Sequence, residues 1–285
     1  MIKNSLLTLA FISTVHVLKG TKTSLGEYPF MVILQDVCNA SVCSGTLISL
    51  KHGLTTGHCC EIFLPVYVIA GDYTTPSKAS DSRDTRKIMF TVIHPKYRKA
   101  FIKTLDVDVA VFKVRTPFNQ STNLAPIAIS VLFPSRHEKC RALAWTSVGL
   151  ESTGQELHYE DVKIEGALIL PQSIILRTSC SCFNMPRQGN HPIPSIKLGG
   201  PLICKYSKLE FIGTLVATKG PSAFFLSLAS HKIWIKMVMD WNGNGSPPLA
   251  SVSQRIHGSL FVIFIIELAR ISNIFKLFRN ILFKT

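Results

Sequence analysis

The chain has 285 residues, of which 47% are hydrophobic and 17% charged, and its formal net charge is +14. This composition excludes an intrinsically disordered chain, because enough apolar surface is available to form a core. The positive charge favours acidic partners such as anionic glycans or a membrane surface, and the alternative is a basic secreted protein with no such partner. The basic residues are scattered and no nucleic-acid-binding motif is present, so we expect no nucleic-acid partner.

The first 16 residues have the composition of a signal peptide. Lys3 precedes a short apolar stretch, and the cleavage position is not marked by a clear small-x-small pattern. An uncleaved anchor and a buried helix are the alternatives. The chain also has eight cysteines and two Asn-x-Ser sequons, at Asn39 and Asn119. Both features fit an oxidising compartment, so we expect a secreted glycoprotein with disulfide bonds.

Between residues 30 and 230 the chain consists mainly of short apolar or alternating runs separated by turn residues. The strand candidates, in chain order, are 30–35, 44–49, 66–73, 87–94, 107–114, 141–145, 162–170, 200–206, 211–217 and 223–229. Many short strands without helical periods between them favour an all-β barrel or sandwich.

The periodicity changes near residue 231. Trp234, Met237, Val238 and Trp241 follow the i, i+3, i+4, i+7 spacing of one helical face. We therefore expect a helix whose apolar face, including these four residues, packs on the β structure. Residues 242–257 begin with an Asn-Gly-Asn-Gly-Ser-Pro-Pro sequence and are predicted to form a linker.

Residues 258–285 form a separate apolar and basic tail. Glu267 and Arg270 interrupt its apolar run, so a full span of a bilayer is not expected. Beyond them, isoleucine, leucine and phenylalanine residues share one helical face with basic residues around it, which favours an amphipathic helix on a membrane surface. A helix docked on the β structure and an error in the gene model are the alternatives.

Several motifs occur in an order that is specific for one family. They are "GEYPFMVIL" (26–34), "CSGTLIS" (43–49), "TTGHCC" (55–60), "VIHPKY" (92–97), "DVAVFKV" (108–114), "CRALAW" (140–145) and "GGPLIC" (199–204). Together they resemble the trypsin-like, chymotrypsin-fold serine proteases over about residues 17–241. The resemblance implies an all-β fold of two six-stranded antiparallel β-barrels followed by a C-terminal α-helix. It also implies two disulfide bonds, Cys43–Cys59 and Cys140–Cys204.

The resemblance gives roles to two residues of the first barrel. His58 matches the family's general base, and Asp108 matches the buried carboxylate that orients it. A hydroxyl is a weak nucleophile unless an imidazole accepts its proton, and the carboxylate fixes the tautomer of that imidazole. The alternative is a retained hydrogen-bonded pair without a catalytic role.

The segment before "GGPLIC" departs from the family pattern at three positions. Leu198 occupies the position of the family's serine, and a leucine side chain has no nucleophilic atom. Ile196 replaces the glycine of the oxyanion turn, and Lys197 replaces the aspartate that pairs with the new N-terminus after activation. Ser195 lies nearby in sequence, but moving it into position 198 would shift the segment off its Gly-Gly-Pro-Leu-Ile-Cys register.

These departures lead to a functional prediction. We expect a catalytically inactive homologue, not an enzyme, that binds extracellular protein partners as a cofactor, decoy or scaffold. The alternatives are an active serine endopeptidase with a non-standard nucleophile and a membrane-associated structural or adhesion protein. We expect neither a cofactor nor a metal site.

Four cysteines remain outside the two implied disulfide bonds. A Cys38–Cys60 bond is one pairing, since both residues flank the first implied pair. Cys180 or Cys182 resembles half of another family bridge, but the sequence offers no clear partner. Free thiols and intermolecular bonds are the alternatives.

Overall fold

The computed structural model describes residues 20–71, 74–75, 83–99, 105–148, 154–171, 173–179, 196–219 and 221–249. The predicted signal peptide, the tail 258–285, Ser195, Cys180 and Cys182 lie outside these residues.

The first barrel is closed by six antiparallel strands. In spatial order they are β2 (Met31–Gln35), β3 (Ser41–Leu47), β4 (His52–Thr55), β8 (Ala110–Val114), β7 (Asp84–Ile93) and β5 (Tyr67–Ala70). Its core contains fully buried Val32, Leu34 and Phe112. A side chain at Gly53 would lie 2.2 Å from the ring of Phe112, so glycine is required where β4 crosses this core.

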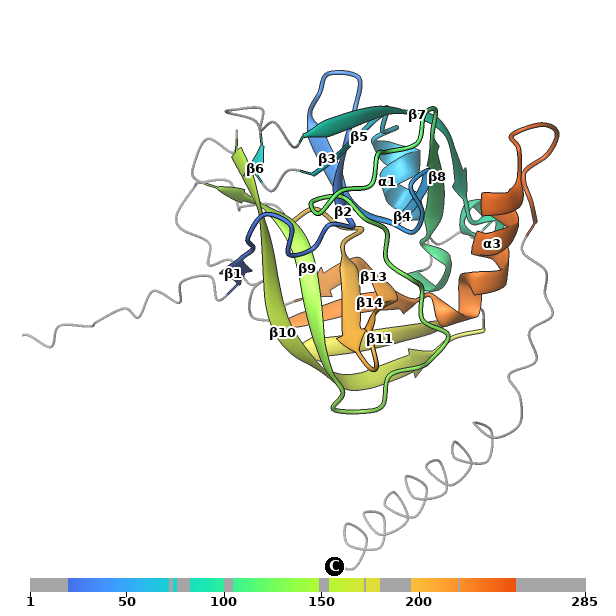
Figure 1. Cartoon of the computed structure of the whole chain (residues 1–285). Helices are drawn as coiled ribbons and strands as arrows, with labels where there is room; N and C mark the ends of the chain where they lie inside the picture. Colours follow the sequence, from blue (N-terminus) through green and yellow to red (C-terminus); the bar gives the residue numbers. More distant parts are fainter. Residues whose placement is uncertain are drawn as a thin grey trace, which may run out of the picture. The chain divides into compact units, whose positions relative to one another are not determined.

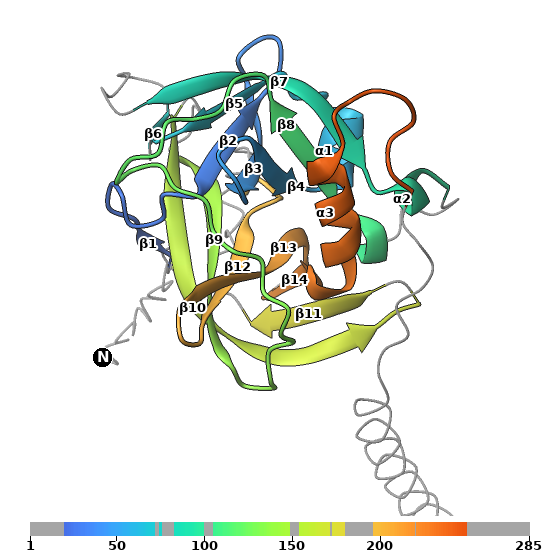
Figure 2. The same cartoon turned by 45° about the vertical axis from the view of Figure 1, so that its right-hand side comes forward.

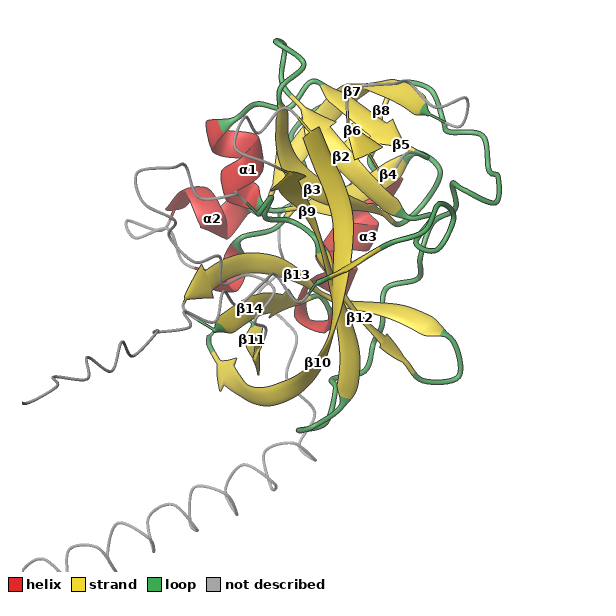
Figure 3. Ribbon diagram, turned by 90° about the vertical axis from the view of Figure 1, so that its left-hand side faces the viewer, coloured by secondary structure: helices red, strands yellow, loops and turns green. Residues whose placement is uncertain are grey.

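The second barrel is also closed by six antiparallel strands. In spatial order they are β9 (Lys139–Val148), β10 (Gly154–Ile169), β11 (Ile174–Ser179), β14 (Ser222–Ser227), β13 (Leu209–Lys219) and β12 (Pro201–Lys205), with β9 pairing again with β10. The short strands β1 (Thr21–Lys22) and β6 (Thr74–Thr75) add to β10. An irregularity between Ile164 and Gly166 accompanies the bend of β10 that is visible in Figure 3.

The two barrels pack against each other, one above the other in Figure 1. Trp145 of β9 is almost fully buried, and its indole N–H donates to the carbonyl of Val32 on β2 at 3.1 Å. Apolar residues of both barrels form one buried cluster here, including Leu54 and Leu143. The junction is therefore a continuous core and not a loose contact between domains.

Within the residues that the structure describes, helices are few and short. They are α1 (Gly57–Ile62), α2 (Pro95–Lys99) and α3 (Lys232–Asp240), with 3₁₀ turns η1 (Leu105–Val107) and η3 (Ala229–His231). Helix α3 follows the last strand of the second barrel and returns to the first barrel, where it contacts β8 (Figure 2). The ammonium of Lys113 on β8 donates to the carbonyl of Trp241 at 3.2 Å, just beyond the end of α3.

The predicted fold is confirmed, with corrections in detail. Each of the ten predicted strands overlaps one observed strand, but the barrel strands β4 and β11 and the two-residue strands β1 and β6 were missed. β4 is only four residues long and contains a glycine, so it carries too short a pattern to identify. On α3 the buried residues are Trp234, Ile235 and Val238, whereas Met237 is 39% exposed. The prediction that Met237 packs on the barrel is wrong, because the buried face of the helix includes Ile235 in place of Met237.

Disulfide bonds join Cys43 to Cys59 and Cys140 to Cys204, as the resemblance implied. The suggested Cys38–Cys60 bond is not formed: Cys38 is exposed on the loop after β2, and Cys60 is buried in α1. The first bond ties α1 to β3, and the second ties β9 to β12.

Candidate active site

His58 is the second residue of α1, and Thr56 and Gly57 separate it from the end of β4. Its backbone position is fixed by the neighbouring Cys59, which is bonded to Cys43 on β3. A side chain at Gly57 would approach Asp108 Oδ1 to 3.2 Å. The absence of a side chain at Gly57 therefore leaves room for the carboxylate beside the start of the helix.

Asp108 follows η1 and is buried. Its Oδ2 lies 2.6 Å from Nδ1 of His58, and its Oδ1 accepts the backbone N–H of His58 at 2.8 Å. The side chain of Asp108 is 5% exposed, whereas that of His58 is 19% exposed. Because both carboxylate oxygens contact the same residue, the ring is oriented with Nδ1 toward Asp108 and Nε2 on its other side.

The hydroxyl of Thr56 lies 3.5 Å from Nε2 of His58. Thr56 is fully buried, so a peptide substrate has no access to this hydroxyl. The contact between Thr56 and His58 is long for a hydrogen bond. In the His58–Asp108 pair, Nε2 therefore remains the atom that can exchange a proton with a substrate.

The Ile196–Gly200 segment is attached to both barrels. Ser44 of β3 donates its backbone N–H to the carbonyl of Leu198 at 2.9 Å and its hydroxyl to the carbonyl of Lys197 at 2.7 Å. The backbone N–H of Lys197 donates to Trp145 of β9 at 3.0 Å. Since Ser44 follows the cysteine bonded to Cys59, position 198 belongs to the same junction as His58. No pattern in the sequence indicates this role for Ser44.

The two glycines after Leu198 are required by their surroundings. Gly199 has φ +96°, and a side chain there would lie 2.3 Å from the carbonyl oxygen of Ser44. A side chain at Gly200 would lie 2.1 Å from the carbonyl oxygen of Leu143. These contacts explain why the Gly-Gly pair accompanies this turn whatever residue precedes it.

The side chains before the glycines are apolar or desolvated. Leu198 and Ile196 are partly buried and pack against the core of the second barrel. Lys197 is also partly buried, and burial lowers the pKa of its ammonium group. The family roles assigned to positions 196, 197 and 198, and to His58 and Asp108, remain predictions from the alignment of motifs.

A family model described as Trypsin matches residues 17–223. The chain belongs to the trypsin family. The similarity covers both barrels up to β14, in agreement with the antiparallel topology and the His58–Asp108 pair.

Curated relatives of this trypsin-family chain are named serine proteases. Serine protease VLSP-1 of Macrovipera lebetinus is 23% identical, and the match covers 85% of this chain and 94% of that protein. Snake venom serine protease KN3 of Trimeresurus stejnegeri is 25% identical over 85% of this chain and 95% of the relative. Snake venom serine protease ussurin of Gloydius ussuriensis is 22% identical over 81% of this chain and 100% of the relative.

These comparisons contradict the prediction of an inactive, purely binding homologue and of a chain that is not an enzyme. The family and the names of its relatives support a proteolytic enzyme. The prediction rested on the departures at Ile196, Lys197 and Leu198, whereas the structure keeps His58 and Asp108 in hydrogen-bonding contact. Among the described residues, no helix is long and apolar enough to cross a membrane.

Proposed function

We propose that this trypsin-family chain is a secreted serine-type endopeptidase with a non-standard nucleophile. The observation that carries the proposal is the His58–Asp108 pair, with 2.6 Å between Nδ1 and Oδ2. A buried carboxylate beside a partly exposed imidazole is the arrangement that general-base catalysis of acyl transfer needs.

In this reaction His58 transfers the proton, and Asp108 stabilises the charge on the ring. Nε2 of His58 accepts the proton of the attacking hydroxyl and later donates it to the leaving amine, while Asp108 stabilises the imidazolium that forms in between. The hydroxyl comes from a residue other than Leu198, because that side chain cannot form an acyl bond. Ser195 is the first residue to test, since it lies three positions upstream in the sequence.

A fluorophosphonate probe tests the proposal directly, because it reacts with a serine that an adjacent base activates. We expect the purified chain to be labelled and to hydrolyse peptides, and the His58→Ala variant to lose both properties. Digestion and mass spectrometry of the labelled chain would identify the nucleophile. No label on any serine, together with no peptide hydrolysis, would overturn the proposal.

Matched variants then assign the nucleophile. Ser195→Ala is expected to abolish labelling, whereas Ser207→Ala, at an exposed residue between β12 and β13, is expected to leave it unchanged. Labelling that survives Ser195→Ala but maps to another serine would keep the endopeptidase proposal and replace Ser195 in it.

Secretion and glycosylation form part of the same proposal. Support comes from the names of the relatives, which describe venom proteins, and from the exposure of Asn39 and Asn119. Expression in a eukaryotic cell should yield chain in the medium whose mass falls on treatment with an N-glycosidase. Retention inside the cell, or an unchanged mass, would contradict this part.

A further inference from the structure

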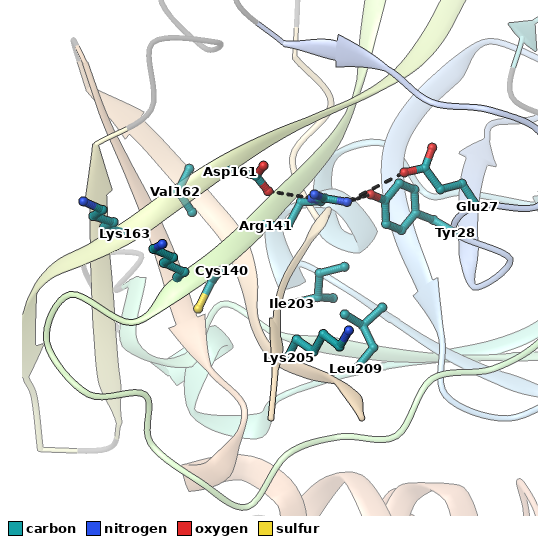
Figure 4. A pocket seen from close by; sticks show the side chains of 11 residues that line it. Glu27, Tyr28, Cys140, Arg141, Asp161, Val162, Lys163, Ile203, Lys205 and Leu209 are labelled. Carbon is teal, nitrogen blue, oxygen red and sulfur yellow. Dashed lines mark hydrogen bonds and ion pairs between the residues drawn. The ribbon is translucent and has the colours of Figure 1, made fainter. Parts of the chain in front are cut away.

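A pocket of about 700 Å³ opens on the second barrel, where β10, β9 and β12 lie side by side. Glu27 and Tyr28, which precede β2, close one side of it (Figure 4). Its volume is within the range of small-ligand sites, about 300–1,000 Å³. Neither His58 nor Asp108 is among its described lining residues, so the pocket is separate from the candidate active site.

On one side of the pocket, the charged side chains are already paired with one another. Arg141 of β9 donates to Asp161 of β10 at 2.7 Å and to the hydroxyl of Tyr28, and lies 3.7 Å from Glu27. Its guanidinium also lies 4.1 Å from the centroid of the Tyr159 ring. Arg141 is therefore already engaged by protein groups and acts as a fixed wall of the pocket (Figure 4).

The other half carries three lysines in a row across neighbouring strands. Lys163 of β10 is paired in register with Lys139 of β9, and Lys205 of β12 comes directly after the Cys204–Cys140 register pair. Paired residues of adjacent strands point to the same face of a sheet, so the three side chains of this lysine row share the outer face with Arg141. The row ends at Leu209 of β13, which is paired with Lys205 and is 37% exposed.

The lysine row has no counter-charge within the described part of the chain. All three side chains are exposed, and none makes an ion pair or side-chain hydrogen bond there. The nearest carboxylates of the pocket, Asp161 and Glu27, are engaged by Arg141. Like charges directly opposite each other on two strands are destabilising, so the arrangement is one that a bound polyanion would stabilise.

The geometry favours a polysaccharide over an acidic peptide. β9 is hydrogen-bonded on both sides, to β10 and to β12, so a peptide cannot add to it as a further strand. Among the described lining residues, the available cations are ammonium groups, which act as point charges, whereas the guanidinium of Arg141 is already engaged by Asp161 and Glu27. At a strand spacing of roughly 4.8 Å, the row spans about 10 Å and presents its charges along a line.

We propose that the lysine row and its pocket bind a sulfated glycan chain, whose successive anionic groups contact Lys163, Lys139 and Lys205. The apolar side of the chain's sugar rings lies against Leu209. The proposal is independent of proteolysis, because no residue of it belongs to the His58–Asp108 pair.

Binding of a heparin-derived hexasaccharide to the full chain, measured by calorimetry at physiological ionic strength, tests this. The triple variant Lys139→Gln, Lys163→Gln, Lys205→Gln should raise the Kd at least tenfold. A control triple with the same loss of charge, Lys87→Gln, Lys219→Gln, Lys236→Gln, changes exposed lysines elsewhere and should raise the Kd less than threefold. The single variant Lys139→Gln removes the middle charge and should raise the Kd severalfold.

Four results would overturn the proposal. They are no binding at physiological ionic strength, equal weakening in the two triple variants, unchanged binding after chemical desulfation of the hexasaccharide, and tighter binding of a polyglutamate peptide or of anionic phospholipid vesicles. The thermal midpoint of the lysine-row variants should be equal to or above that of the wild type, because repulsion between Lys139 and Lys163 is relieved. Weakened binding would then not be attributable to unfolding.

Discussion

The two barrels share one architecture but hold their parts of the candidate site differently. The first barrel supplies His58 and Asp108, and both the ring Nδ1 and the backbone N–H of His58 contact the Asp108 carboxylate. The second barrel supplies the turn at Gly199, whose backbone is fixed by Ser44 and Leu215, yet the preceding side chain is Leu198. Backbone contacts can therefore preserve the shape of this turn independently of the side chain that the turn presents.

The largest expected effect concerns the first barrel's pair. If the pair is catalytic, Asp108→Asn should lower kcat by roughly 10⁴-fold, because the amide favours the wrong imidazole tautomer. Peptide hydrolysis and thermal unfolding of the same samples measure this. A small loss of kcat with an intact fold would show that the first barrel's half of the site is only a structural remnant.

The disulfide bonds allow the stability of the two barrels to be compared. Cys140 and Cys204 are separated by 64 residues, whereas Cys43 and Cys59 are separated by 16. In the chain-entropy description, their removal by paired Cys→Ala substitutions should cost about 4 and about 3 kcal/mol respectively. Urea unfolding measures both, and the reverse order would indicate that native-state contacts outweigh loop length.

A buried histidine tests the junction between the barrels. His94, after β7, packs against His231 and Trp234 around α3, and burial lowers its pKa to about 3. The unfolded chain then binds more protons than the folded chain between about pH 6.5 and pH 3. The free energy of unfolding should therefore fall as the pH falls through this window, with a contribution from His94 of about 1.4 kcal/mol per pH unit at most.

Substitution separates this contribution from that of other groups. His94→Phe should reduce the slope of the unfolding free energy between pH 6 and pH 4, whereas His137→Asn, at an exposed residue, should leave it unchanged. Equal slopes in the wild type and His94→Phe would contradict a role for His94 at the junction.

The smallest expected effect concerns the second barrel's turn. Leu198→Ser should add no new fluorophosphonate-labelled residue, because the motif alignment predicts that Ile196 and Lys197 replace the family's oxyanion and activation residues. Mass mapping of the labelled variant measures this. A label on position 198 would show that the hydroxyl alone completes the second barrel's half of the site.

Sequence alone predicted much of the fold and part of the site. Alternating apolar runs identified ten of the strands, and the resemblance placed the two disulfide bonds correctly. Strand β4 was missed because four residues with a glycine carry little periodic signal. The prediction of an inactive homologue took the departures at Ile196, Lys197 and Leu198 as decisive, and it was wrong because the family match spans both barrels and the relatives are named serine proteases.

Other features depend on distances that only the folded chain defines. The sequence determined the order of motifs, the excess of positive charge and the residue at position 198, since each is a property of single positions or short spacings. Only the tertiary structure decided that Ser44 holds the Lys197–Leu198 backbone and that Cys38 and Cys60 are not bonded to each other. It also decided that Arg141 is engaged, whereas the three lysines of the row make no ion pair with any described residue. The physical reason is that strand register brings residues such as Lys139, Lys163 and Lys205 to one face, although up to 66 positions separate them in the chain.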